Sequence, residues 1–273
     1  MTTRLSVERE EFYPIDMIVR EVLDYLEKLK GDVDYVTYVP DGEPTLDINL
    51  GREARLLKKK IETPLAIISN GSLLFREDAR TDLMEFDLVS VKMDAVREKI
   101  WRIINRPHHS LSIDRILDGV RRFAKEFKGT LITETMLLKN LNDDLETITE
   151  VADFISELKP SKAYIAIPTR PPTEEWVRGA DEEKLVAAFE IFRKRIKDVE
   201  LLTGYEGAEF TLLGDPIKAF LATISVHPLR VDYALKILSD KIQEPEKTLE
   251  NLLNLGKIKI VEYRGTKFIL RKL

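Results

Sequence analysis

The sequence predicts an α/β fold built on a parallel sheet, followed by a small C-terminal α+β module. Short apolar runs alternate with amphipathic helical segments over roughly the first 200 residues, a pattern typical of βαβ units. Polar and turn residues cluster directly after the apolar runs. Ligands of parallel sheets bind at the carboxyl ends of the strands, so we expect the functional site there.

Six runs have the composition of buried strands, rich in apolar and β-branched residues. They are residues 34–39, 64–69, 87–94, 130–138, 162–167 and 199–203. Apolar residues at helical spacing predict the helices between them, with Gly or Pro following several of their ends. These helices are expected at 15–30, 50–61, 75–84, 113–127, 143–158 and 181–196.

Composition excludes several classes of site and protein. The chain of 273 residues has no cysteine, which excludes a disulfide, a cysteine nucleophile and a thiolate metal site contributed by this chain. With only three histidines, a His-rich zinc site is not expected. No apolar run approaches the ~18 residues that span a membrane, and no signal-peptide core opens the chain. We therefore expect a cytoplasmic protein without a membrane partner.

The chain is expected to form two domains, 1–210 and 215–273. Gly256–Leu273 holds six Lys or Arg residues against one Glu, within a chain of net charge −5. Residues 226–239 and 245–255 are expected to be helices, and 257–271 a hairpin turning at Arg264-Gly265. This order suggests a winged-helix-like module. Its basic hairpin fits either packing against another protein surface or non-specific contact with RNA, whereas 245–255 has few basic residues for reading DNA.

Seven short segments carry a resemblance to a known family. They are Asp41-Gly42-Glu43-Pro44-Thr45-Leu46, Ser69–Leu74, Val91–Asp94, Ile104–His108, Glu134–Leu137, Asn142-Asp143 and Pro168–Pro172. In this order and spacing they resemble radical S-adenosylmethionine (radical SAM) enzymes, in the branch of archaeal Fe–S oxidoreductases related to wyosine synthetase. The similarity covers roughly residues 5–200.

The resemblance implies a partial (β/α)6-type TIM barrel that lacks its first strand. It also implies SAM and a [4Fe–4S] cluster as cofactors, an external reductant, and reductive SAM cleavage for radical modification of a substrate, with RNA as one candidate. The family's Cys-x3-Cys-x2-Cys loop precedes a stretch like Thr2–Pro14, and this chain has no cysteine to ligate the cluster. We therefore expect either a start downstream of the full protein's start or a relative without a cluster.

The resemblance assigns SAM binding to residues at the first two strand ends. Glu43 would accept the α-amino group of SAM, Gly42 would let the backbone come close, and Pro44 would stiffen the loop. The family's first glycine is Asp41 here, which adds a negative charge. Asn70 would either bond SAM or organise the Asn-Gly turn.

Further candidates lie on later strands. Ser90, Lys92 and Asp94 alternate, so they would share one polar face. Glu134 lies in a strand, where a carboxylate needs a partner or a ligand, and Lys92 is a candidate partner. Arg170, in a Pro-rich loop, would clamp a substrate carboxylate or phosphate, or form a surface ion pair. The resemblance assigns no catalytic residue.

Three functions remain open on sequence alone. The first, which we favour for the gene as a whole, is a radical SAM enzyme, of which this chain would be an inactive fragment because no thiolate holds the cluster. The second is a non-catalytic SAM- or nucleotide-binding regulator, which we favour for the polypeptide as given. The third is a metal-dependent barrel enzyme using Glu43, Asp94 and Glu134 for Mg²⁺ or acid–base chemistry.

Overall fold

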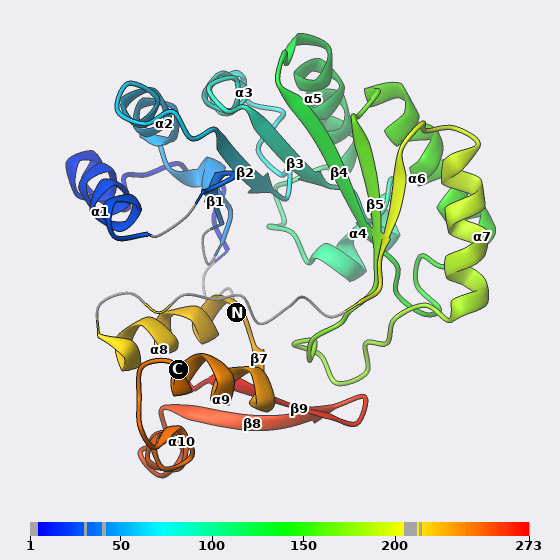
Figure 1. Ribbon diagram of the computed structural model, residues 1–273. Helices are drawn as coiled ribbons and strands as arrows, with labels where there is room; N and C mark the ends of the chain where they lie inside the picture. Colours follow the sequence, from blue (N-terminus) through cyan, green and yellow to red (C-terminus); the bar gives the residue numbers. More distant parts are fainter. Residues whose placement is uncertain (1–4, 30–31, 40–41, 205–211, 213–214, 273) are drawn as a thin grey trace. The chain divides into compact units, whose positions relative to one another are not determined.

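The chain divides into two compact units, drawn in Figure 1. The computed structural model describes residues 5–29, 32–39, 42–204, 212 and 215–272. The first unit comprises Met1–Pro168 and Val177–Thr203, and the second comprises Thr169–Trp176 and Gly204–Leu273. Each unit has a hydrophobic core of its own. None of the described helices combines the length and the apolar character needed to cross a membrane.

The first unit is built on a six-stranded sheet in which every strand is parallel to its neighbours. The strands follow chain order across the sheet, with β1 and β6 at its edges. They are β1 Val36–Tyr38, β2 Leu65–Ser69, β3 Leu88–Lys92, β4 Thr130–Met136, β5 Lys162–Ala166 and β6 Val199–Leu202. All six expected strands are confirmed, each inside its expected range, and the sheet fits a partial barrel.

One helix precedes the first strand, and the other helices connect the strands. They are α1 Ile15–Lys28, α2 Leu50–Lys58, α3 Glu77–Leu83, α4 Glu98–Asn105, α5 Ile113–Glu126, α6 Leu145–Leu158 and α7 Glu182–Arg193. Apart from α4, they lie along one side of the sheet in chain order (Figure 1). The strand residues alternate accordingly: in β4, Leu131, Thr133 and Thr135 are buried, whereas Ile132, Glu134 and Met136 stay partly exposed on the other face.

Two elements of the first unit were not expected from the sequence. One is α4, which ends at Arg106 in the left-handed conformation (φ 46°). The other is a turn of 3₁₀-helix, η1, at Pro44–Leu46, inside the Glu43 motif. Both are short, so neither leaves a periodic apolar pattern long enough to detect.

The described part of the second unit contains three helices and a three-stranded antiparallel sheet. Its elements are α8 Pro216–Val226, β7 Leu229–Arg230, α9 Val231–Ser239, α10 Pro245–Asn254, β8 Ile258–Tyr263 and β9 Thr266–Arg271. The sheet order is β7-β9-β8. The hairpin turn at Arg264-Gly265 is confirmed, and both residues have positive φ (49° and 73°).

The helix expected at 226–239 is wrong in its first turn. His227 is not helical (φ −139°, ψ 88°), because the ring of Pro228 disfavours the helical region for the residue before it. The chain instead forms the short strand β7, and α9 begins at Val231. Helix α8 was not expected, although Asp215 and Pro216 mark its start: the Asp215 carboxylate accepts the N–H groups of Ile217 and Lys218.

Candidate functional site

The expected binding residues of the first unit lie at the carboxyl ends of β1, β2, β3 and β4. These strands are parallel neighbours, so their carboxyl ends share one edge of the sheet. Glu43 follows β1, Asn70 follows β2 and Asp94 follows β3, while Glu134 in β4 is paired with Lys92 in β3. Their contacts form two groups, one around Glu43 and one around Lys92.

Glu43 precedes η1 as its N-cap, and its carboxylate is fixed by four hydrogen bonds. Oε1 accepts the N–H (3.1 Å) and hydroxyl (2.6 Å) of Thr45 and the hydroxyl of Ser69 (2.7 Å). Among the described residues, the one hydrogen bond that Oε2 accepts comes from the N–H of Asn70 (2.7 Å). Burial raises the pKa of Glu43, and the hydrogen bonds oppose this rise by stabilising the charged form. The four hydrogen bonds fix the direction in which the carboxylate points.

Gly42 and Pro44 lie on either side of Glu43: the first leaves space beside the backbone, and the second restricts the backbone of the turn. A Cβ added at Gly42 would meet no described atom within 4 Å, so the protein leaves the space at this backbone open. Pro44 is buried at the first position of η1, where its fixed φ suits the turn. Asp41, the departure from the family motif, lies outside the described residues.

The end of β2 is shaped by Ser69 and Asn70. The Ser69 hydroxyl donates to Glu43 and accepts the N–H of Gly71 (3.0 Å), which has a φ of +72°. Asn70 Oδ1 accepts the N–H of Ser72 (2.8 Å), closing a turn. Of the two roles expected for Asn70, its side chain thus performs the organisation of the turn, and its contact with a ligand stays a prediction.

Lys92 joins two carboxylates at the ends of β3 and β4. Its Nζ lies 3.1 Å from Glu134 Oε1 and 3.5 Å from Asp94 Oδ1. Burial alone would lower the pKa of Lys92, but the charges of Asp94 and Glu134 raise it above the usual value. The ammonium therefore stays charged, and the expected pairing of Lys92 with Glu134 is confirmed.

Asp94 is the buried member of this group, with a side chain 1% exposed. It lies beyond the end of β3, where Oδ1 accepts the N–H of Met136 (2.9 Å) and Oδ2 accepts Asn105 Nδ2 (2.9 Å). Asn142 supports the same loop, because its Nδ2 donates to the carbonyls of Asp94 (2.8 Å) and Met136 (2.9 Å). Asp94 thus ties β3, β4 and α4 together.

Asn105 carries a buried oxygen without a partner. Its Nδ2 donates to Asp94, which turns Oδ1 the other way, and that Oδ1 accepts no hydrogen bond among the described residues. A buried acceptor of this kind is costly unless a donor reaches it. Asn105 belongs to one of the motifs quoted above but was given no role there, and because α4 was not expected, no sequence signal marked this asparagine.

Two expected site residues have a weaker structural case. Ser90 is buried in β3, two residues before Lys92, and its hydroxyl makes no hydrogen bond among the described residues. Arg170 belongs to the Thr169–Trp176 stretch of the second unit. Its role at a substrate rim stays a prediction.

The described residues do not form a metal site. No three His, Asp or Glu side chains among them lie close enough to hold a metal ion. Asp94 and Glu134 share Lys92, whereas Glu43 is saturated on Oε1 by protein donors. The converging carboxylates that a metal-dependent barrel enzyme requires are therefore not present in this part of the chain.

The family follows from comparison with known proteins. The radical SAM superfamily model matches residues 3–155, more than half of the chain. The chain belongs to the radical SAM superfamily. UPF0026 protein MJ1312 of Methanocaldococcus jannaschii is 41% identical over 275 residues, which cover 100% of this chain and 85% of the relative. The resemblance drawn from the sequence is confirmed at the level of the superfamily.

Two solved structures of this radical SAM fold are similar to the chain. A domain of pyruvate-formate lyase-activating enzyme from Bacteroides vulgatus has a TM-score of 0.50 at 18% identity, covering 61% of this chain and 97% of that one. SuiB of Streptococcus suis, solved with S-adenosylmethionine, has a TM-score of 0.52 at 17% identity, covering 72% and 45%. At these identities the likeness shows the fold alone.

The radical SAM family implies two cofactors, and the residues of this chain fit only one of them. SAM fits, because the strand ends offer a fixed carboxylate at Glu43, a charged ammonium at Lys92 and an unpaired acceptor at Asn105. A [4Fe–4S] cluster does not fit, because Fe–S clusters are held by cysteine thiolates and the chain has none.

Proposed function

We propose that this chain binds S-adenosylmethionine at the carboxyl ends of β1 to β4. The observation that carries the proposal is the Glu43 carboxylate, held in one direction at the edge of the sheet within a radical SAM superfamily member. Binding is the function proposed for these residues; reductive cleavage of SAM would require a cluster that they cannot ligate.

Glu43 would receive the α-amino group of SAM. A carboxylate offers about four lone-pair positions, two on each oxygen. In the part of the chain that the structure describes, Oε1 accepts three hydrogen bonds, whereas Oε2 accepts one, from Asn70. An ammonium would therefore bond Oε2, in a charge-assisted hydrogen bond whose acceptor is already oriented.

Lys92 and Asn105 would hold the rest of the ligand. The Lys92 ammonium has three donors, and its two carboxylate partners leave one of them for a ligand oxygen. Its side chain is 29% exposed, so this donor is within reach of a ligand. Asn105 Oδ1 would accept from a hydroxyl or amino group, which would satisfy the buried acceptor. Ser90 would line the same face.

Calorimetric titration with SAM tests the proposal. We expect the wild-type chain to bind SAM and Glu43→Gln to bind roughly 10- to 100-fold more weakly, the usual effect of losing a charged hydrogen bond. Methylthioadenosine, which lacks the amino-acid half of SAM, should bind both proteins equally.

Glu62→Gln serves as the matched control, because Glu62 is exposed before the amino end of β2, away from the proposed site. It should bind SAM as the wild type does. Absence of binding at millimolar SAM, or equal affinity of the wild type and Glu43→Gln, contradicts the proposal.

We also propose that the second unit is a winged-helix-like module whose basic hairpin contacts RNA without sequence preference. The order helix, strand, helix, helix, hairpin supports the first part. The exposed Lys259, Lys267 and Arg271 on β8 and β9 support the second. Exposed Glu246 and Glu250 on α10 speak against base reading by that helix.

Fluorescence anisotropy with a short single-stranded RNA tests this second proposal. Affinity should fall steeply with salt, and replacing Lys259, Lys267 and Arg271 together by alanine should remove it. Binding that is unchanged by salt and by the triple replacement contradicts it.

A further inference from the structure

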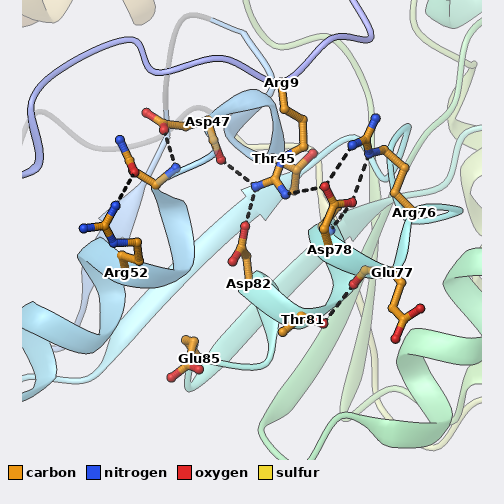
Figure 2. A network of polar contacts seen from close by, with 12 residues as sticks. Arg9, Thr45, Asp47, Arg52, Arg76, Glu77, Asp78, Thr81, Asp82 and Glu85 are labelled. Carbon is orange, nitrogen blue, oxygen red and sulfur yellow. Dashed lines mark hydrogen bonds and ion pairs between the residues drawn. The ribbon is translucent and has the colours of Figure 1, made fainter.

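Arg9 is a buried guanidinium outside the group of residues assigned to SAM. It lies in the segment before α1, and its side chain is 5% exposed. Figure 2 shows it between the turn that follows Glu43 and the carboxylates of α3. A buried charge is costly unless it is paired and bonded, so this position requires compensating partners.

On one side, Arg9 is anchored to α3. It forms ion pairs with Asp78 (3.1 Å), in the first turn of the helix, and with Asp82, one turn further along. Arg76 holds Asp78 from the solvent side through two hydrogen bonds (3.0 and 2.8 Å). The hydrogen bonds from Arg76 and Arg9 lower the pKa of Asp78 well below its usual range, so this anchor stays charged.

On the other side, Arg9 holds the turn that carries Glu43. Its Nη2 donates to the carbonyl of Asp47 (2.6 Å), the residue that ends η1. The backbone of Glu10 continues this contact: its N–H donates to the Leu46 carbonyl (3.0 Å), and its carbonyl accepts the N–H of Ile48 (3.2 Å). Glu43 lies at the opposite end of the same short turn, as its N-cap.

We propose that Arg9 is a positioning residue for the SAM site: it braces the η1 turn against α3 and so sets the direction of the Glu43 carboxylate. This inference rests on the proposed binding of SAM at Glu43. The planar guanidinium reaches two carboxylates and a carbonyl at once, which the single ammonium of a lysine cannot do with the same geometry.

The test compares Arg9→Lys and Arg9→Met with Arg76→Met as the matched control. Arg76→Met also removes an arginine from Asp78, but Arg76 makes no described contact with the turn. Each protein is titrated with SAM and with methylthioadenosine at a temperature where circular dichroism shows it folded. Should Arg9→Met not fold, Asp82→Asn, which weakens the same brace, replaces it.

We expect the Arg9 variants to change the affinity for SAM but not the affinity for methylthioadenosine. SAM affinity should fall about tenfold in Arg9→Lys, the scale of one misplaced hydrogen bond, while methylthioadenosine affinity stays unchanged. Arg76→Met should change neither affinity. Equal losses for both ligands, or a lower melting temperature with no change in either affinity, would show that Arg9 is only structural and overturn the inference.

Amide hydrogen exchange separates this inference from the binding proposal. The N–H groups of Leu46 and Asp47 close the η1 turn on the carbonyls of Glu43 and Pro44. If the wild type does not bind SAM, the binding proposal fails, and the exchange rates still decide on Arg9. Faster exchange of these two amides in Arg9→Lys than in Arg76→Met supports the brace, and equal rates overturn it.

Discussion

Glu53 shows how strongly a single side chain can depart from its ordinary chemistry. It lies on α2 with 3% of its surface exposed, and its Oε1 has no hydrogen-bond partner among the described residues. Burial raises its pKa to about 7, and the charges of Asp47 and Glu11 contribute to that rise. Tyr38 nearby also has a buried hydroxyl for which the described residues provide no hydrogen-bond partner.

Glu53→Gln should therefore change the pH dependence of stability. A carboxyl group whose pKa is higher in the folded state binds more protons there, so it lowers the free energy of unfolding as pH rises from the unfolded pKa toward 7. Glu53 should contribute a loss on the order of 3 kcal/mol across this window. Urea unfolding between pH 4.5 and 8 should show that loss in the wild type and less of it in Glu53→Gln.

The exposed Glu62→Gln is the control, because it should keep the wild-type pH dependence. The same slope in Glu53→Gln as in the wild type would show that folding does not raise the pKa of Glu53.

At the residue scale, the sequence predicted the pairing of Lys92 with Glu134 and the position of Glu43 after a strand end, but not the residues that support them. The Lys92–Glu134 pair could be predicted because the two residues lie on neighbouring strands, within long apolar runs of the sequence. Ser69 and Asn142 reach their partners across 26 and 48 positions of sequence, which only the packed sheet brings together. Arg9 contacts Asp82, 73 positions away, and no local pattern marks it.

At the element scale, α5 depends on a glycine in its interior. A Cβ at Gly119 would lie 2.3 Å from the carbonyl carbon and oxygen of Leu74, and 2.4 Å from the backbone nitrogen of Phe75. Such contacts with main-chain atoms cannot be relieved by a rotamer change. Gly119 therefore lets α5 pack directly on the loop after β2.

Gly119→Ala should consequently destabilise the protein, although alanine favours helices by about 1 kcal/mol over glycine. We expect a net loss of roughly 1–3 kcal/mol, the usual range for overpacking, measured by urea unfolding. Lys125→Ala, on an exposed position of the same helix, should change stability little. A more stable Gly119→Ala protein would show that α5 does not approach the loop as closely as described.

Lys92 links β3 to β4. Its removal should lower the stability of the protein, because Asp94 is buried and would lose its cation. Lys92→Met leaves Asp94 and Glu134 without their cation, and we expect a loss on the order of 3 kcal/mol in the free energy of unfolding. Lys162→Met is the comparison, because Lys162 in β5 also faces two carboxylates, Asp198 and Glu200, that are half exposed. It should lose less, and equal losses would contradict the role of burial.

Strands were easier to predict than short elements. The six strands of the first unit are contiguous apolar runs, because parallel strands are buried by the helices that connect them. By contrast, α4, η1 and β7 span eight, three and two residues. Their conformations are set by tertiary contacts and by neighbours such as Pro228, so the 226–239 helix was expected too early.

At the scale of the whole molecule, the parallel α/β architecture could be predicted from the alternation of strands and helices. Whether the chain can hold an Fe–S cluster depends instead on its cysteine content, which is zero. The superfamily implies SAM together with an Fe–S cluster; SAM binding by this chain is our proposal, and the chain has no cysteine to hold the cluster. Nothing in the strand pattern distinguishes a chain that can hold a cluster from one that cannot; the cysteine content does.

Anaerobic incubation with iron and sulfide tests this division. After desalting, we expect no bound iron and no visible charge-transfer absorbance, because the chain has no thiolate to hold a cluster. With SAM and a strong reductant, no 5′-deoxyadenosine should form. A stable, stoichiometric visible absorbance would contradict this expectation and show that other ligands hold the metal.

The most direct test of the central claim is a crystal structure of the chain with SAM. The account predicts SAM at the carboxyl ends of β1 to β4, with its α-ammonium in hydrogen-bond contact, about 3 Å, with Glu43 Oε2. It also predicts that the hydrogen bonds from Thr45 and Ser69 to Oε1 are unchanged. SAM bound elsewhere, or with its ammonium away from Glu43, would contradict the account.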